Sequence, residues 1–176
     1  AEEKNFKEVN QYFKIARNLY IPNILKKANT TLRSNILKED IEVISEGFKI
    51  SDHNIVPLTR YSIKSLLKTG VRLGLYDNDL LDGSLHEELF KYAEEIIDYS
   101  LMDLLFFNGL RQMEEKYLTK HKGNLLEDPQ QHFILIALAL THSDVQTYSK
   151  GNTLEFQKES LLNYYRIQAK GESNNP

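Results

Sequence analysis

The chain has 176 residues, of which 41% are hydrophobic, and a formal net charge of −3 at pH 7. This length is enough to bury a hydrophobic core as one compact unit. Lys and Arg are scattered among Asp and Glu, without the basic stripe that nucleic-acid binding requires, so we expect no nucleic-acid partner.

Cysteine is absent, which excludes disulfides, thiolate nucleophiles and thiolate metal sites. No apolar run approaches the roughly 20 residues that span a bilayer. The first ten residues, AEEKNFKEVN, have neither the basic start nor the apolar stretch of a signal peptide. We therefore expect a cytoplasmic protein without membrane contact.

The first 55 residues predict a helical arm. Apolar residues recur at helical spacing over residues 6–16, and Pro22 suits the first turn of a second helix, so we expect a helical hairpin. Residues 37–48 repeat the helical pattern, with acidic residues in the first turn. Residues 50–56 are rich in Asp, His and Asn between β-branched residues and predict an extended connector.

The following residues predict further helices. Pro57 can open a helix that ends near Gly74. Ser84 and Glu87 form a capping box ahead of an apolar stripe that predicts the next helix. Residues 102–117 continue a helical stripe and are apolar on other faces too, so we expect a central, deeply packed helix there.

The C-terminal part completes an all-α prediction. Residues 121–124 predict a turn, after which Asp128 caps, and Pro129 begins, the helix that carries the apolar run 133–140. A last helix is expected over residues 154–169.

We expect three parts along the chain. Residues 1–55 form the helical arm, residues 56–169 form a multi-helix domain, and residues 170–176 form a flexible tail because they contain no apolar anchor.

No group of side chains in the sequence predicts a metal centre. Three histidines, His121, His132 and His142, have a spacing that matches no local ligand motif. The acidic loop of residues 77–82 superficially resembles a calcium loop, but two leucines interrupt its ligand series. We expect its carboxylates to cap neighbouring helices, and we assign no catalytic, cofactor-binding or metal-binding residue.

Three short motifs occur in a fixed order between residues 75 and 140. Their members, with one aspartate that lies between the first two motifs, are Tyr76, Asp77, Leu80 and Leu81; Asp98; Glu115, Lys116, Tyr117 and Leu118; and Glu127, Pro129 and Gln130. In order and spacing they resemble the helical N-terminal region of the large, catalytic subunit of class I (aerobic) ribonucleotide reductase. The resemblance extends more weakly from about Val56 through the final helix.

This resemblance implies a helical domain that packs against the α/β barrel of a reductase large subunit and does not contain that barrel. In the family, one cysteine forms a thiyl radical and a cysteine pair supplies the reducing electrons. A chain without cysteine can do neither. The resemblance therefore implies an N-terminal piece of a split or truncated ribonucleoside-diphosphate reductase, which completes an enzyme that makes deoxyribonucleotides for DNA synthesis.

The same resemblance implies two partners: the barrel-bearing chain and, indirectly, the radical-generating small subunit.

Two departures from the family's sequence pattern limit what the resemblance implies. Leu101 and Met102 stand where the family has an Arg and a second Asp after the position of Asp98, so no nucleotide role is carried over to this cluster. Residues 1–55 lack the Lys-Arg-Asp-Gly turn of the family's ATP cone.

Two alternatives remain open from the sequence. One is a helical protein-interaction or regulatory module derived from such a domain, and the other is an unrelated helical bundle with a chance match. A domain built to pack against a barrel should expose an apolar face when it is alone. We expect that face at residues 104–107 and 133–140.

Overall fold

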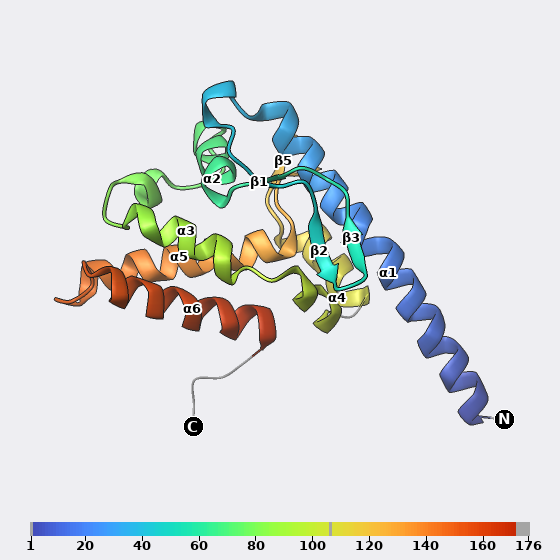
Figure 1. Ribbon diagram of the computed structural model, residues 1–176. Coiled ribbons are helices and arrows are strands. Elements are labelled where there is room, and N and C mark those ends of the chain that lie inside the picture. Colours follow the sequence, from blue (N-terminus) through green and yellow to red (C-terminus); the bar gives the residue numbers. More distant parts are fainter. Residues whose placement is uncertain (1, 106, 172–176) are drawn as a thin grey trace.

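The computed structural model describes residues 2–105 and 107–171, and 66% of the structure is helical. Figure 1 shows a helical body from which one long helix extends. Three short two-stranded antiparallel ladders accompany the helices. The helical class predicted from the sequence is therefore correct, whereas the short strands were not predicted.

Helix α1 runs without interruption over Glu2–Asn35, so the predicted helical hairpin is wrong. Pro22 lies inside this helix, although an interior proline costs about 3 kcal/mol because it removes a hydrogen bond. The cost is offset because the helix buries one face over three turns, formed by Ile21, Ile24, Leu25, Ala28 and Leu32. In Figure 1 the N-terminal half of α1 projects beyond the body.

The predicted helix over residues 37–48 is also wrong. A 3₁₀ turn, η1 (Lys38–Asp40), is followed by strands β1 (Val43–Ser45), β2 (Phe48–Ser51), β3 (Asn54–Val56) and β4 (Arg60–Tyr61). β1 pairs with β4 and β2 pairs with β3, in both cases antiparallel. In β2, Phe48 and Ile50 are buried and alternate with exposed residues, which is the two-residue period of a strand. Residues 50–56 have extended backbone at both ends, as predicted, but the chain reverses at residues 52 and 53, so they form a hairpin and not a connector.

Helix α2 (Ile63–Arg72) begins later than predicted, because Ser62 accepts a hydrogen bond from the Ser65 N–H and caps its start. It ends near Gly74, as predicted. A 3₁₀ turn, η2 (Asn78–Leu81), leads to helix α3 (Glu87–Ile96). The predicted capping box is wrong, since His86 is the N-cap of α3 and makes no side-chain cap.

The single helix predicted over residues 102–117 is divided into three pieces. They are the 3₁₀ helix η3 (Tyr99–Leu104), helix α4 (Phe107–Gln112) and a π-helical turn, η4 (Met113–Tyr117). The Asp98 carboxylate accepts hydrogen bonds from the N–H and the hydroxyl of Ser100, which stabilises the tighter turn at the start. Met102 and Leu110 are fully buried, but Leu104 and Tyr117 are exposed and η4 buries no residue, so the deep packing predicted for the whole segment is wrong.

The turn predicted at residues 121–124 is confirmed as a hairpin between β5 (Lys120–His121) and β6 (Asn124–Leu125). Helix α5 (Pro129–Thr147) follows, capped by Asp128 as predicted. Helix α6 (Leu154–Lys170) agrees with the predicted last helix and is capped by Thr153.

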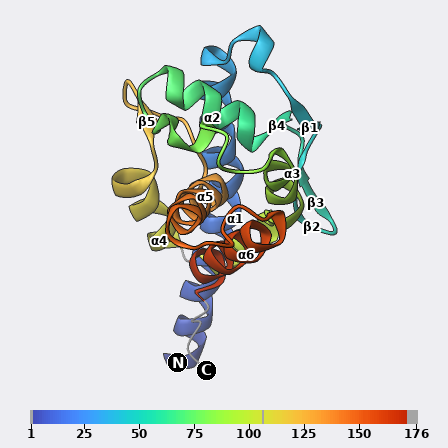
Figure 2. The ribbon, with the colours of Figure 1, turned by 90° about the vertical axis from the view of Figure 1, so that its left-hand side faces the viewer.

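Helices α5 and α6 lie side by side, with α3 against α6 (Figures 1 and 2). This packing buries Phe133 to Leu135, Ala137 and Leu138, so the prediction that the 133–140 face is open is wrong for these residues. Only its C-terminal end, at Leu140, has a large apolar side chain that is exposed, to 41%.

The other predicted apolar face, residues 104–107, is described only in part. Leu104 is 55% exposed, whereas Phe106 and the Phe107 side chain lie outside the described residues, as does most of the predicted tail, residues 172–176. No helix within the described ranges is both long enough and apolar enough to span a bilayer.

Candidate functional site

The most unusual polar group of the domain is the Glu127 carboxylate, which is only 1% exposed. Its Oε2 accepts a 2.6 Å hydrogen bond from the Tyr76 hydroxyl. Its Oε1 accepts from the backbone N–H of Thr119 at 2.9 Å and lies 2.7 Å from Nδ1 of His132. A buried carboxylate is stable only when donors surround it in this way.

Local structure brings Tyr76 to this carboxylate. After α2 the chain reverses at Gly74, which has a left-handed φ of 76°. The Tyr76 ring then lies directly on the backbone of Gly70, where an added Cβ would be 2.0 Å from the ring. Burial, followed by the charge of Glu127, raises the pKa of Tyr76 well above its ordinary value, so its hydroxyl remains a donor.

A second buried carboxylate, Asp128, lies next to Glu127 in the sequence. One of its oxygens accepts from the Tyr99 hydroxyl at 2.8 Å and the other from the Gln131 N–H at 2.9 Å. The Gln131 side chain accepts in return from the Asp128 N–H, which completes a capping box. Burial raises the pKa of Asp128 to about 6.

Gln130 connects α5 to α6 inside the core. Its Oε1 accepts a 2.5 Å hydrogen bond from the Tyr165 hydroxyl, which in turn accepts from the Asp98 N–H at 3.0 Å. Its amide nitrogen lies 3.7 Å from the sulfur of Met102. Burial raises the pKa of Tyr165, so this hydroxyl also stays protonated.

The motif residues divide into a buried group and an exposed group. Tyr76, Glu127 and Gln130 make the buried contacts described above, and Leu80, Leu118 and Pro129 are buried beside them. Asp77 is exposed and caps η2 by accepting from the Asp79 N–H, as predicted for this acidic loop. In the second motif, Glu115, Lys116 and Tyr117 are also exposed.

A cavity of about 370 Å³ lies beside the Glu127 network. Its wall is mainly apolar, with Leu75, Leu80 and Leu135 among the lining residues, and His132 and His142 also line it. His142 contacts Asp82 at 3.0 Å rather than His132, and His121 lies in the β5–β6 hairpin. Within the described ranges, no three potential metal-ligating side chains come together.

The hydrogen bonds of Glu127 determine what it can do chemically. One of its oxygens has one hydrogen-bond partner and the other has two, and all three partners belong to the domain. A buried network of this kind specifies and rigidifies a fold. The arrangement therefore favours a structural role for Glu127 over a role as an acid or base.

Sequence reasoning missed several members of this network. The pairing of Asp128 with Gln131 has a readable signal, since the two residues have capping-box spacing. The contacts of Glu127 with His132 and of Asp128 with Tyr99 have no such signal, because the first joins a loop to a helix and the second joins residues far apart in the chain.

Comparison of this chain with protein families, with curated proteins and with solved structures finds no match in any of the three.

Proposed function

We propose that this chain is the helical N-terminal domain of a class I ribonucleotide reductase large subunit and that its role in the enzyme is structural. The observation that carries the proposal is the hydrogen bond between Tyr76 of the first motif and Glu127 of the third, 51 residues apart in the sequence. Thr119, which directly follows the second motif, donates to the same carboxylate.

This convergence supports the resemblance because the motifs were matched by order and spacing alone. Residues matched by chance have no reason to meet in space. Here members of the first and third motifs, together with the residue that follows the second motif, meet around one buried carboxylate, where the loss of any partner leaves a costly unsatisfied group.

The proposed role is not catalytic. Thiyl-radical reduction of a ribonucleotide requires cysteines, and these 176 residues contain none. The cysteine-bearing α/β barrel therefore lies outside this sequence, and the helical domain packs against it. The radical-generating small subunit would act on the barrel, not on this domain.

The exposed part of the second motif is the proposed contact with the barrel. Tyr117 is 62% exposed, and Leu104, at the end of η3, is 55% exposed. Apolar side chains that contribute little to their own core are suited to an interface with another chain. Lys116 and Tyr117 of the motif are exposed and have no packing role within the described part of the domain, so an interface with the barrel would give them a role.

Co-expression with a barrel-bearing chain and the radical-generating subunit tests the proposal. We expect the three proteins together to convert a ribonucleoside diphosphate to its deoxy form, and this chain alone to convert none. Tyr117→Asp should weaken its binding to the barrel chain, whereas the control Tyr148→Asp, at a similarly exposed tyrosine after α5, should not. Failure of the two chains to bind would refute the proposal. Binding that inhibits an already active barrel chain would favour the regulatory alternative instead.

A further inference from the structure

A groove of about 710 Å³ lies between the second half of α1 and the β5–β6 hairpin. On α1 it is lined by polar residues at four-residue spacing, with one row formed by Lys26, Thr30 and Ser34 and the other by Lys27, Thr31 and Asn35. Residues at this spacing lie on one face of a helix. The opposite wall is the hairpin, from Lys120 to Leu125.

The charge of the groove has the opposite sign to that of the whole chain. Its lining includes Lys26, Lys27, Lys120 and Lys122, and the one acidic side chain in that lining is Glu114. Glu114 is held by Lys27 at 2.9 Å. Among the described residues, the other three lysines have no carboxylate within ion-pairing distance. The groove is therefore a cationic surface on an acidic protein, whose net charge is −3.

The lysine ammonium groups are the charged hydrogen-bond donors of the groove, and of these Lys27 donates to Glu114 at 2.9 Å and Lys120 to the Glu115 carbonyl at 3.4 Å. The hydroxyls of Thr31 and Ser34 donate to carbonyl groups one turn earlier in α1, at 3.2 and 2.9 Å. Ammonium groups on both walls can converge on one anion between them, and several such charges in a recess bind phosphate oxygens better than one lysine does alone. Amides of Asn23 and Asn124 also line the groove.

We infer that this groove binds a small anion that carries more than one phosphate group. The volume exceeds what a single phosphate fills, and the lysines come from two walls, so a ligand with several phosphates would engage both. The lining of the groove includes none of the residues that contact Glu127, although the β5–β6 hairpin connects Thr119 to that carboxylate. The inference does not depend on the proposed reductase role.

The test is calorimetric titration of the full chain at low salt with tripolyphosphate and with fructose 1,6-bisphosphate. We expect at least one of them to bind, with amide NMR shifts that map to residues 23–35 and 120–125. Tighter binding of tripolyphosphate would assign the site to contiguous phosphates. Tighter binding of the sugar would assign it to separated phosphates on an organic body.

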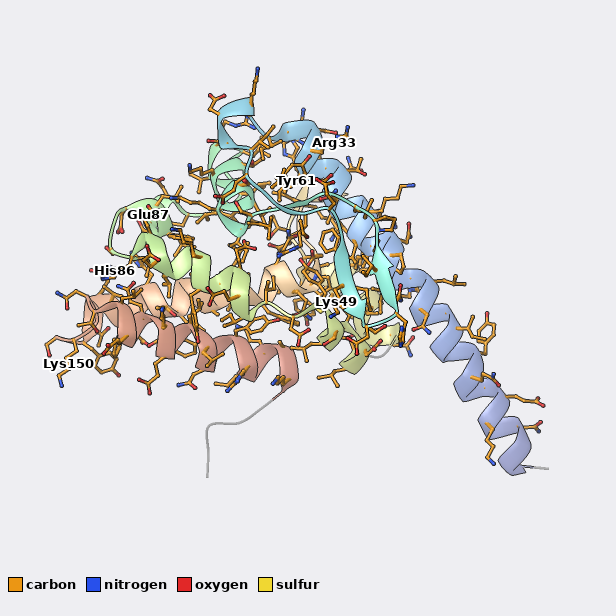
Figure 3. All side chains as sticks on the ribbon, viewed as in Figure 1. Arg33, Lys49, Tyr61, His86, Glu87 and Lys150 are labelled. Carbon is orange, nitrogen blue, oxygen red and sulfur yellow. The ribbon has the colours of Figure 1, made fainter. Side chains whose placement is uncertain are left out.

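The decisive variant is Lys120→Gln with Lys122→Gln, which should weaken binding by about tenfold or more because two charged donors are lost. The matched control is Lys49→Gln with Lys150→Gln, which removes the same charge from β2 and from the α5–α6 connection, as Figure 3 shows. The control should bind as the unmodified chain does. If the hairpin variant does not fold, Lys26→Gln with Lys27→Gln on the other wall gives the same test.

Three results would overturn the inference. The first is that neither ligand binds, and the second is that both double variants lose affinity equally, which would indicate general attraction to positive charge. The third is that single-stranded oligonucleotide binds more tightly than either small ligand, because the groove would then serve a nucleic acid.

Discussion

Replacement of Tyr76 by Phe removes one hydroxyl from the Glu127 network and leaves the ring in place on Gly70. The lost hydrogen bond is short, 2.6 Å, and its acceptor is a buried carboxylate. Hydrogen bonds to charged groups contribute about 1.5–3 kcal/mol, so we expect the free energy of unfolding to fall by about 2 kcal/mol. Because stabilities of domains are typically about 5–15 kcal/mol, this is a large fraction of the total.

Urea unfolding followed by circular dichroism measures this loss. With a denaturant slope of about 2 kcal/mol per molar urea, the midpoint should fall by about 1 M. Tyr164→Phe is the matched control, since the Tyr164 hydroxyl donates to Asp144 over 2.7 Å at a partly exposed site. Its loss should cost less than about 1 kcal/mol, because solvent replaces the hydroxyl there. If Tyr76→Phe costs no more than Tyr164→Phe, the assignment of a structural role to this network is wrong.

Further substitutions test neighbouring parts of the account. Gly70→Ala should destabilise the fold by about 1–3 kcal/mol because the new methyl group would collide with the Tyr76 ring, whereas Gly109→Ala, where a Cβ meets nothing within 4 Å, should be neutral or stabilising in thermal melts. Equal melting temperatures for the two variants would contradict this packing. Burial raises the pKa of Asp128 from 3.8 to about 6. Between these pH values the folded chain binds a proton at this carboxyl and the unfolded chain does not. The contribution of this carboxyl to the free energy of unfolding therefore increases as the pH falls from about 6 to 3.8. Asp128→Asn should remove this contribution, and urea midpoints with the same pH dependence in both proteins would show that the carboxyl does not titrate there.

The helices that the sequence predicts well carry local signals. Helix α5 begins where Asp128 and Pro129 predict it, because capping depends only on residues within one turn. The same holds for the last helix. Its start follows the Ser149 to Thr153 loop, and Thr153 forms the cap.

The elements that the sequence predicts wrongly depend on distant contacts. Residues 37–48 have a helical apolar period, yet Val43 pairs with Tyr61 and Ser45 pairs with Arg60, which only the folded chain brings near. Pro22 signals a helix start locally, but the buried face of α1 extends the helix through it. In both cases tertiary packing overrides the local preference.

The sequence identifies some residues of the candidate site as motif residues, but it does not predict their geometry. The sequence identifies Tyr76 and Glu127 as motif residues, and nothing in either motif indicates that the two side chains meet. Their contact depends on the reversal at Gly74 and on the absence of a side chain at Gly70. The buried position of the 133–138 run, predicted as an open face, likewise depends on α6, which follows it in the chain.

The most direct test of the central claim is the rate of deoxyribonucleoside diphosphate formation by a barrel-bearing chain and its radical-generating subunit, measured with and without this domain. We expect turnover when all three are present and none from this domain with the radical-generating subunit alone. Turnover by the domain without any barrel chain, or a barrel chain whose rate is the same in its absence, would contradict a structural role in the enzyme.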